Sequence, residues 1–244
     1  MKRIVDYFDR SYIINLKDRV DRRQEVSREF RCSGINIPNE RVRFYTATRP
    51  TDSGNFATIG MRGCFTSHLN VLENAQRDNL RNVLVFEDDV SFRDIGVDFQ
   101  NRLLDDLSRR RWDLLWLGYL KPDKVALSGP LAYWGEDILG SHCYAVNGPF
   151  IGAMAQYMQD CERRPPNHPD GGPMPADGAF NHVRYVKKDV VLLLAVPQLA
   201  VQRSSRSDVT PTIIDRNRWL KSLTPFARRI KHQIRMTLDK RRPR

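Results

Sequence analysis

The chain lacks the features that mark several large classes of protein. None of its apolar runs approaches the roughly 20 residues that cross a bilayer, and charged residues interrupt its first ten positions before a signal core can form. Its four cysteines are scattered without a CxxC pair, so a zinc knuckle or a redox pair has no support. We therefore expect a cytosolic globular protein whose cysteines are buried free thiols.

Acidic residues are almost missing from the last part of the chain. From Arg216 onward there are eleven Lys/Arg and one acid, a formal charge of +10, whereas residues 1–215 carry only +1. The basic character therefore belongs to the tail, which argues against a nucleic-acid groove across the main body. We divide the chain into a domain over 1–215 and a tail over 216–244.

The tail has the pattern of a basic amphipathic helix. Apolar residues recur there every three to four positions from Trp219 to Leu238, and cations fill much of the space between them. Such a helix suits an anionic membrane surface, so we expect a peripheral protein on the inner face of the cytoplasmic membrane. Packing of the helix on the domain and binding of RNA are the alternatives.

Apolar segments rich in β-formers alternate with helical patterns along the domain, which predicts an α/β fold. Strands are expected over residues 12–16, 42–47, 82–86, 112–117, 143–146 and 190–195. Helices are expected up to Cys32, over 63–75, around 103–107 and over 150–161. A loop with five prolines, 163–176, precedes a short helix and could act as a flap. The alternation predicts a Rossmann-type sandwich with a mostly parallel central sheet.

Three consecutive acids, Glu87, Asp88 and Asp89, end the uncharged strand 82–86. Ligands of open α/β sheets bind beyond the carboxyl ends of strands, and carboxylates on one side there suit Mn²⁺ or Mg²⁺. Alternation along the strand predicts Glu87 and Asp89 as the metal ligands, with Asp88 on the other side. The acids could instead begin a turn or cap the next helix. The cluster alone does not separate a sugar transferase from a nucleotidyl or phosphoryl transferase.

Three blocks together make the function more specific. Residues 12–16 with the arginines that follow them, Gly63–His68, and Val85–Val90 resemble glycosyltransferase family 25 in order and rough spacing. That family includes bacterial lipopolysaccharide β-galactosyltransferases and collagen galactosyltransferases. Looser echoes lie at residues 140–144, 175–177 and 197–209, so the resemblance covers roughly residues 10–210.

The resemblance implies a GT-A fold, a UDP-sugar donor and a divalent metal held by an Asp-x-Asp-like motif, here Glu87-x-Asp89. It also implies transfer with inversion, which needs a general base on the acceptor hydroxyl. The expected acceptor is a lipopolysaccharide or another lipid-linked glycan, the expected sugar is galactose, and no nucleic-acid partner is expected.

Under this interpretation several residues surround the donor. Asn15 and Leu16 end the first strand beside the nucleotide, and Arg19 and Arg22 pair with the diphosphate because guanidinium forks suit phosphate oxygens. Asn15 could instead be a turn residue, and Arg23 is expected on an exposed helix face. The remaining donor-binding candidates are Gly63, Ser67, His68, Asp88, His142 and, more weakly, Gln202 with Ser207.

Some of these residues could instead have a purely structural role. Gly63 could be an ordinary helix-start glycine, and His68 and His142 could be structural histidines. Asp177 is the candidate general base because it follows the proline-rich loop. It could equally cap the short helix after it, and Glu136 and Asp137 compete for the role.

Two other classes of function stay open at this point. A nucleotidyl or phosphoryl transferase would use the same carboxylates, but the chain has neither a GxxxxGK nor a GxGxxG phosphate loop. A non-catalytic adaptor at the membrane surface would use the basic tail and leave the acidic strand end unexplained.

Overall fold

The computed structural model describes residues 3–122, 125 and 129–203. The helices are α1 (Ile4–Tyr7), α2 (Val20–Cys32), α3 (Ile59–Arg77), α4 (Val97–Arg109), α5 (Gly148–Arg163) and α6 (Ala176–Val186). The strands are β1 (Arg10–Asn15), β2 (Val42–Thr46), β3 (Asn82–Glu87), β4 (Val90–Phe92), β5 (Leu114–Gly118), β6 (Leu131–Tyr133), β7 (Cys143–Asn147), β8 (Leu192–Ala195) and β9 (Ala200–Gln202).

The strands form one mixed sheet in the order β2-β1-β3-β7-β5-β8-β6, with β4 and β9 paired beside it. Strands β2, β1 and β3 run parallel to one another, as do β5 and β8. Strand β7 lies antiparallel between β3 and β5, and β6 is antiparallel to β8. The prediction of an α/β fold with a mostly parallel sheet is confirmed.

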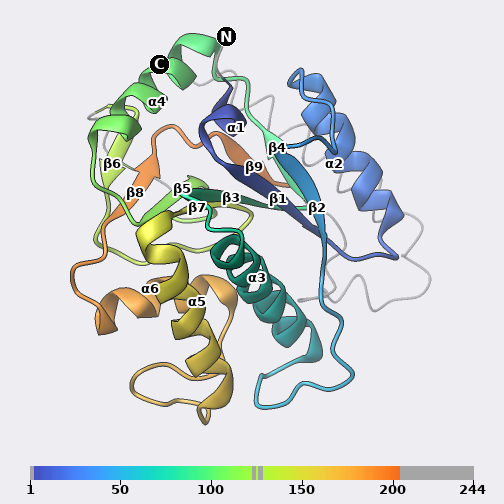
Figure 1. Cartoon of the computed structure of the whole chain (residues 1–244), viewed down its shortest axis with the longest axis vertical. Helices are drawn as coiled ribbons and strands as arrows, with labels where there is room; N and C mark the ends of the chain where they lie inside the picture. The colour runs from blue at the N-terminus through green and yellow to red at the C-terminus, as the bar shows by residue number, and fades with distance from the viewer. Residues whose placement is uncertain (1–2, 123–124, 126–128, 204–244) are drawn as a thin grey trace.

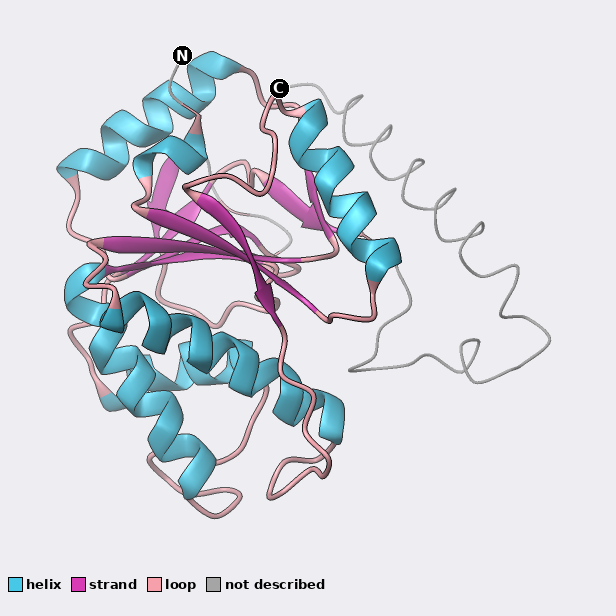
Figure 2. Cartoon of the chain, turned by 45° about the vertical axis from the view of Figure 1, so that its right-hand side comes forward, coloured by secondary structure: helices cyan, strands magenta, loops and turns pink. Residues whose placement is uncertain are grey.

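Helices cover both faces of the sheet, as Figures 1 and 2 show. Helices α3, α5 and α6 pack on one face around Val83 and Val85, and helices α1, α2 and α4 pack on the other around Leu84 and Phe86. The two cores draw on alternate residues of β3 because successive side chains of a strand point to opposite faces. A strand covered on both sides must be apolar throughout, which explains the uncharged run before Glu87.

Several predicted boundaries are corrected by the structure. Helix α3 begins at Ile59 rather than Gly63, because the hydroxyl of Thr58 accepts a hydrogen bond from the backbone N–H of Met61 and caps the helix there. Strand β2 ends at Thr46, one residue earlier than expected. The short strands β4, β6 and β9 and the one-turn helix α1 were not predicted.

The cysteines are free thiols, as expected, but two of them are not buried. Cys143 and Cys161 are buried, Cys64 is half-buried and Cys32 is exposed at the end of α2. No helix within the described residues is long and apolar enough to span a membrane. The predicted amphipathic helix over 216–244, the domain boundary at 215 and Ser207 lie outside the described residues.

Candidate active site

The carboxylate cluster lies where β1 and β3 end together. Ile14 is paired with Glu87, the last residue of β3, so Asn15 lies beside the turn that holds Asp88 and Asp89. Because β7 runs the other way, its first residues reach the same edge, and the carbonyl of His142 accepts a hydrogen bond from the N–H of Glu87 (3.1 Å). The site therefore lies beyond the carboxyl ends of the parallel strands, as predicted from the fold class.

Asp88 is anchored by two of the predicted donor-binding residues. Its Oδ2 accepts a hydrogen bond from the side-chain amide of Asn15 (2.8 Å), and its Oδ1 accepts one from Arg22 of α2 (2.7 Å). Burial raises the pKa of Asp88, while Arg22 and Asn15 oppose that rise. The pair joins α2 to the turn after β3, so Asp88 acts in this structure as an anchor for Arg22.

Asp89 is the acid with capacity left for a cation. Its Oδ2 accepts a hydrogen bond from Gln202 of β9 (3.2 Å) and lies 3.6 Å from Arg22, whereas its Oδ1 is buried with no hydrogen-bond partner among the described residues. Burial raises the pKa of Asp89 to about 7, and the neighbouring charge of Glu87 adds to the rise. A buried carboxylate oxygen without a donor is what a hard divalent cation would satisfy.

Glu87 faces α3 and the start of β7. Its Oε1 accepts a hydrogen bond from the hydroxyl of Ser141 (2.6 Å) and lies 3.5 Å from the Nε2 of His68. Burial on its own would raise the pKa of Glu87, but His68, Ser141 and His142 outweigh it and lower the pKa to about 2. The pKa of Glu87 is thus lowered, whereas the pKa of the nearby Asp89 is raised.

Glu87 and Asp88 point to opposite faces of the sheet, as alternation predicts. The strand ends at Glu87 and the chain then turns. The side chain of Asp89 therefore does not simply point the same way as that of Glu87, and its carboxylate lies near Arg22, which also contacts Asp88. With Asp88 held by Arg22 and Asn15, the residues that fit a cation are Glu87 and Asp89. They supply the hard oxygen ligands that Mn²⁺ and Mg²⁺ prefer.

His68 is buried under the site. Its Nδ1 lies 2.8 Å from the hydroxyl of Tyr144 in β7, and its Nε2 faces Glu87. Cys64 is one helical turn away in α3. Burial of its thiol raises its pKa, and the negative charges of Glu87, Asp177 and Asp89 add to the rise. These charges place Cys64 near the acids of the site, a position that no pattern in the sequence predicted.

Ser67 and Gly63 hold the helix rather than reach toward a ligand. The hydroxyl of Ser67 donates to the carbonyl of Gly63 (2.6 Å) and accepts from the N–H of Thr48 (2.8 Å). A Cβ on Gly63 would lie 2.9 Å from the carbonyl oxygen of Thr48, so this glycine lets the segment after β2 approach α3. For both residues the described contacts are internal, and a role at the donor stays a prediction.

Asp177 lies in the first turn of α6 and is tied to the site through the segment before β7. Its Oδ2 accepts a hydrogen bond from the N–H of Gly140 and its Oδ1 accepts one from the N–H of Gly178, both at 2.9 Å. Of the competing acids, Asp137 accepts a hydrogen bond from the exposed Tyr185, and only the backbone carbonyl of Glu136 has a described contact, with Arg184.

The remaining predicted residues lie around the same edge. Leu16 is half-buried directly after β1, and Arg19 pairs with Asp21 at 3.0 Å. His142 is fully buried, and a Cβ on Gly118 of β5 would come within 2.7 Å of its Nε2, so Gly118 makes room for the imidazole.

Sequence reasoning missed two residues that shape the turn. The backbone N–H of Arg203 donates to the carbonyl of Asp89 and its guanidinium donates to the carbonyl of Asp88, both at 2.7 Å. Ser141, which binds Glu87, was noted only as part of a motif. Neither contact has a local signal, because the partners are more than 50 residues apart in the chain.

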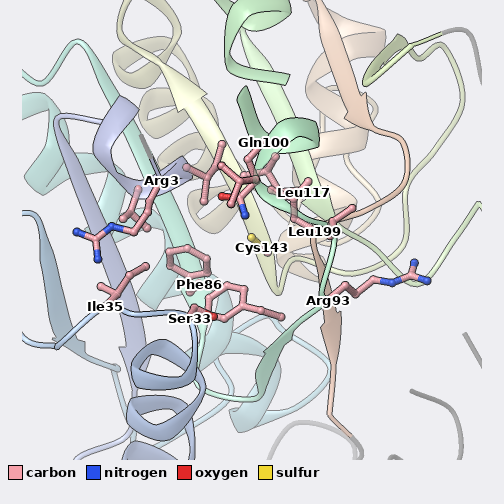
Figure 3. Close-up of a pocket in the computed structure, with 14 residues that line it drawn as sticks. Arg3, Ser33, Ile35, Phe86, Arg93, Gln100, Leu117, Cys143 and Leu199 are labelled. Atoms are coloured by element: carbon pink, nitrogen blue, oxygen red, sulfur yellow. The ribbon is translucent and has the colours of Figure 1, made fainter. Parts of the chain in front are cut away.

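A small apolar cavity lies on the opposite face of the sheet. It has a volume of about 110 Å³, and Figure 3 shows Phe86, Leu117 and Cys143 at its wall with Arg3 and Arg93 nearby. None of the three carboxylates lines it. Phe86 and Glu87 are successive residues of β3 and point to opposite faces, so the cavity lies across the sheet from Glu87.

Comparison with known proteins identifies a family and individual proteins that are similar to part of this chain. Residues 8–124 match the model of glycosyltransferase family 25, described as an LPS biosynthesis protein family. The inactive glycosyltransferase 25 family member 3 of Homo sapiens is 33% identical over 137 residues, which cover 48% of this chain and 23% of the relative. Procollagen galactosyltransferase 1-B of Xenopus laevis is 30% identical over 132 residues, which cover 46% of this chain and 21% of the relative.

Among solved structures, a glycosyltransferase involved in glycosylation of the major capsid of PBCV-1 is similar with a TM-score of 0.47 and 10% identity, over 80% of this chain and 94% of that one. The chain spans less than a quarter of the length of the two curated relatives above. The matched segment carries Asn15, Arg22, His68 and all three carboxylates. Residues 8–124 therefore belong to glycosyltransferase family 25, which confirms the resemblance for the three blocks between residues 12 and 90.

Proposed function

We propose that the chain is an inverting, metal-dependent glycosyltransferase that moves galactose from UDP-galactose onto a glycan acceptor. The observation that carries this proposal is the buried Oδ1 of Asp89, which has no hydrogen-bond partner among the described residues and lies near Glu87, whose pKa is lowered, at the carboxyl edge of the sheet. The family match over 8–124 supports the reaction class.

In this proposal Glu87 and Asp89 hold Mn²⁺ or Mg²⁺, and the cation neutralises charge on the departing nucleotide diphosphate when it is bound. Arg22 keeps its contact with Asp88 and presents the rest of its guanidinium toward the same space. Gln202 orients Asp89 through its side-chain amide, and Ser141 orients Glu87 through its hydroxyl. The acids are thus fixed before the donor arrives.

The nucleotide lies in this proposal at the end of β1, against Asn15, Leu16 and Arg19. Asp177 takes the proton of the acceptor hydroxyl, since its carboxylate is held in place by two backbone N–H groups near the cluster. The charges of Asp177, Glu87 and Asp89 all act on the thiol of Cys64, which supports their placement around one space.

The proposed donor and acceptor are inferred from the descriptions of similar proteins. A similar protein is named a procollagen galactosyltransferase, and the family is described by lipopolysaccharide biosynthesis. We accordingly assign galactose as the sugar and lipopolysaccharide or another lipid-linked saccharide as the acceptor. The basic segment 216–244 would bring the enzyme to the inner face of the cytoplasmic membrane, where such acceptors are assembled.

A second candidate function is a non-catalytic member of the family. The observation that favours it is the name of the human relative, which is called inactive. Such a protein would keep the fold and the binding of a nucleotide sugar or a glycan without transferring the sugar.

The test is turnover of a panel of UDP-sugars by the full chain with Mn²⁺, with and without a glycan acceptor. We expect UDP release from UDP-galactose, its loss in Asp89→Asn, and normal release by Asp105→Asn, a change at an exposed carboxylate of α4. Binding of a UDP-sugar without any turnover would favour the non-catalytic candidate. Absence of both binding and turnover would overturn the proposal.

A further inference from the structure

Three residues of different chemistry converge beside the carboxylate cluster. Cys64 and His68 lie on the same side of α3, one turn apart, and Glu87 faces them from the end of β3. The sulfur of Cys64, a ring nitrogen of His68 and a carboxylate oxygen of Glu87 all lie within 4.8 Å of one another. Asp88 and Asp89 are not part of this group, so it shares only Glu87 with the pair assigned above to the hard cation.

The imidazole of His68 is already oriented for a ligand. Its side chain is 1% exposed, and its Nδ1 contacts the hydroxyl of Tyr144 at 2.8 Å, the kind of contact that fixes the ring of a metal-binding histidine. Its Nε2 is buried, makes no hydrogen bond of good geometry with the described residues and lies 3.5 Å from the Oε1 of Glu87. A buried ring nitrogen without a hydrogen bond is costly unless something else satisfies it.

The spacing and the donor types match one kind of cation. A tetrahedral zinc ion with ligands at about 2.0–2.3 Å places any two of them roughly 3.6 Å apart. The Nε2 of His68 and the Oε1 of Glu87 are 3.5 Å apart, so they need no rearrangement. A thiol with an imidazole and one carboxylate selects zinc or cobalt(II), whereas Mn²⁺ and Mg²⁺ prefer oxygen ligands.

We propose that Cys64, His68 and Glu87 form a binding site for a thiophilic divalent cation of the zinc type, next to the donor site. The three side chains supply three ligands, and a water molecule completes the tetrahedron. The thiol of Cys64 releases its proton to solvent when the cation binds, as coordinating thiols do.

Glu87 belongs to both sites, which gives the zinc-type site a consequence. A cation bound by Cys64 and His68 draws the carboxylate of Glu87 away from Asp89 and from a hard cation held there. Zinc-type ions would therefore oppose the binding of Mn²⁺. The inference itself does not require the chain to be a transferase, because the three ligands and their geometry stand without any reaction.

Cobalt(II) provides the first test, because a thiolate ligand gives it a charge-transfer absorption band. The experiment adds cobalt(II) to the full metal-free chain and to the variants Cys64→Ser and Cys32→Ser. We expect the band in the unmodified chain, its loss in Cys64→Ser and its retention in Cys32→Ser, since Cys32 is exposed at the end of α2. Circular dichroism checks that Cys64→Ser is folded.

A second measurement decides the matter even if Cys64→Ser does not fold. X-ray absorption at the zinc edge of the Cys32→Ser chain, loaded with one equivalent of Zn²⁺, should show one sulfur neighbour at about 2.3 Å together with lighter neighbours. A zinc environment of nitrogen and oxygen alone would overturn the site. So would a cobalt band of equal strength in a folded Cys64→Ser chain.

Discussion

The guanidinium of Arg22 lies 2.7 Å from the Oδ1 of Asp88, and both side chains are almost entirely buried. This pair joins α2 to the turn that carries the other acids, and it does so at the point where the sheet ends. A positive charge is thus built into the site before any cation or donor is present, and it sets which carboxylate is available for binding.

Replacement of Arg22 should destabilise the fold strongly. Arg22→Met leaves Asp88 buried without its counterion, which we expect to cost about 3 kcal/mol of unfolding free energy at pH 8. This loss of unfolding free energy should become smaller as the pH falls, because Asp88 can then take up a proton. Urea denaturation at several pH values measures both effects.

The matched control is Arg49→Met. Arg49 pairs with Asp18 at 2.9 Å, but both side chains are about 60% exposed, so the cost should stay below about 1 kcal/mol. Equal losses for the two variants would contradict the anchoring role of the buried pair.

Stability should depend on pH through Asp89. Its pKa is raised to about 7 in the folded chain, so the folded state keeps a proton that the unfolded state has lost, and stability falls as the pH rises from about 4 to about 7. Glu87 acts oppositely: its pKa is lowered to about 2, so the stability it contributes is present above about pH 4 and is lost as the pH falls toward 2.

Asp89→Asn removes the first of these effects. In metal-free buffer the variant should lose less stability than the unmodified chain between pH 4 and pH 8, by at most about 4 kcal/mol. Denaturation curves in a chelator measure the difference, and Asp105→Asn should follow the unmodified chain. Parallel pH profiles for Asp89→Asn and the unmodified chain would show that Asp89 does not carry the titration.

A methyl group at Gly63 should disturb the packing of α3. In Gly63→Ala the new carbon would lie 2.9 Å from the carbonyl oxygen of Thr48, a backbone atom that cannot turn away. We expect a loss of about 1–3 kcal/mol. Gly135→Ala is the control, because open space surrounds that position and stability should change by less than about 1 kcal/mol. Equal stability of the two variants would refute the close approach.

Asp177→Asn should separate binding from transfer. The asparagine oxygen can still accept a hydrogen bond from Gly140, so donor affinity should stay within a few-fold by calorimetry. Turnover should fall by about 10²–10⁴-fold if the carboxylate is the base. Asp137→Asn changes the acid that pairs with Tyr185 and should retain turnover. Undiminished turnover in Asp177→Asn would show that Asp177 is not the general base.

Most of the strands predicted from the sequence have apolar runs, whereas β2, which contains Arg43, was predicted from its β-branched and aromatic residues. β3 and β5 were predicted because a strand that is buried on both faces contains no charged residue, and that pattern is visible in the strand's own sequence. β4 and β9 are three residues long and exist through their pairing, in which Val90 meets Gln202 across the chain. No local pattern encodes such a partner, so these strands were missed.

The candidate site, too, could be predicted only in part from the sequence. Runs of acids and arginines near strand ends are visible in the sequence, and Arg22 and Asn15 proved to contact Asp88. The contacts of Ser141 with Glu87 and of Arg203 with the turn depend on how distant segments fold together. The position of Cys64 among the carboxylates likewise follows from the packing of α3 against β3.

The antiparallel direction of β7 has a consequence for which residues reach the site. Because this strand enters the sheet at the edge where its parallel neighbours leave it, the residues before Cys143 become part of the rim although they precede a strand. Ser141 and His142 lie in that entering segment and contact Glu87, so substitutions there would change the surroundings of an acid that belongs to a different strand. One reversed strand thus brings the residues before its start to the carboxylates at the end of its neighbour.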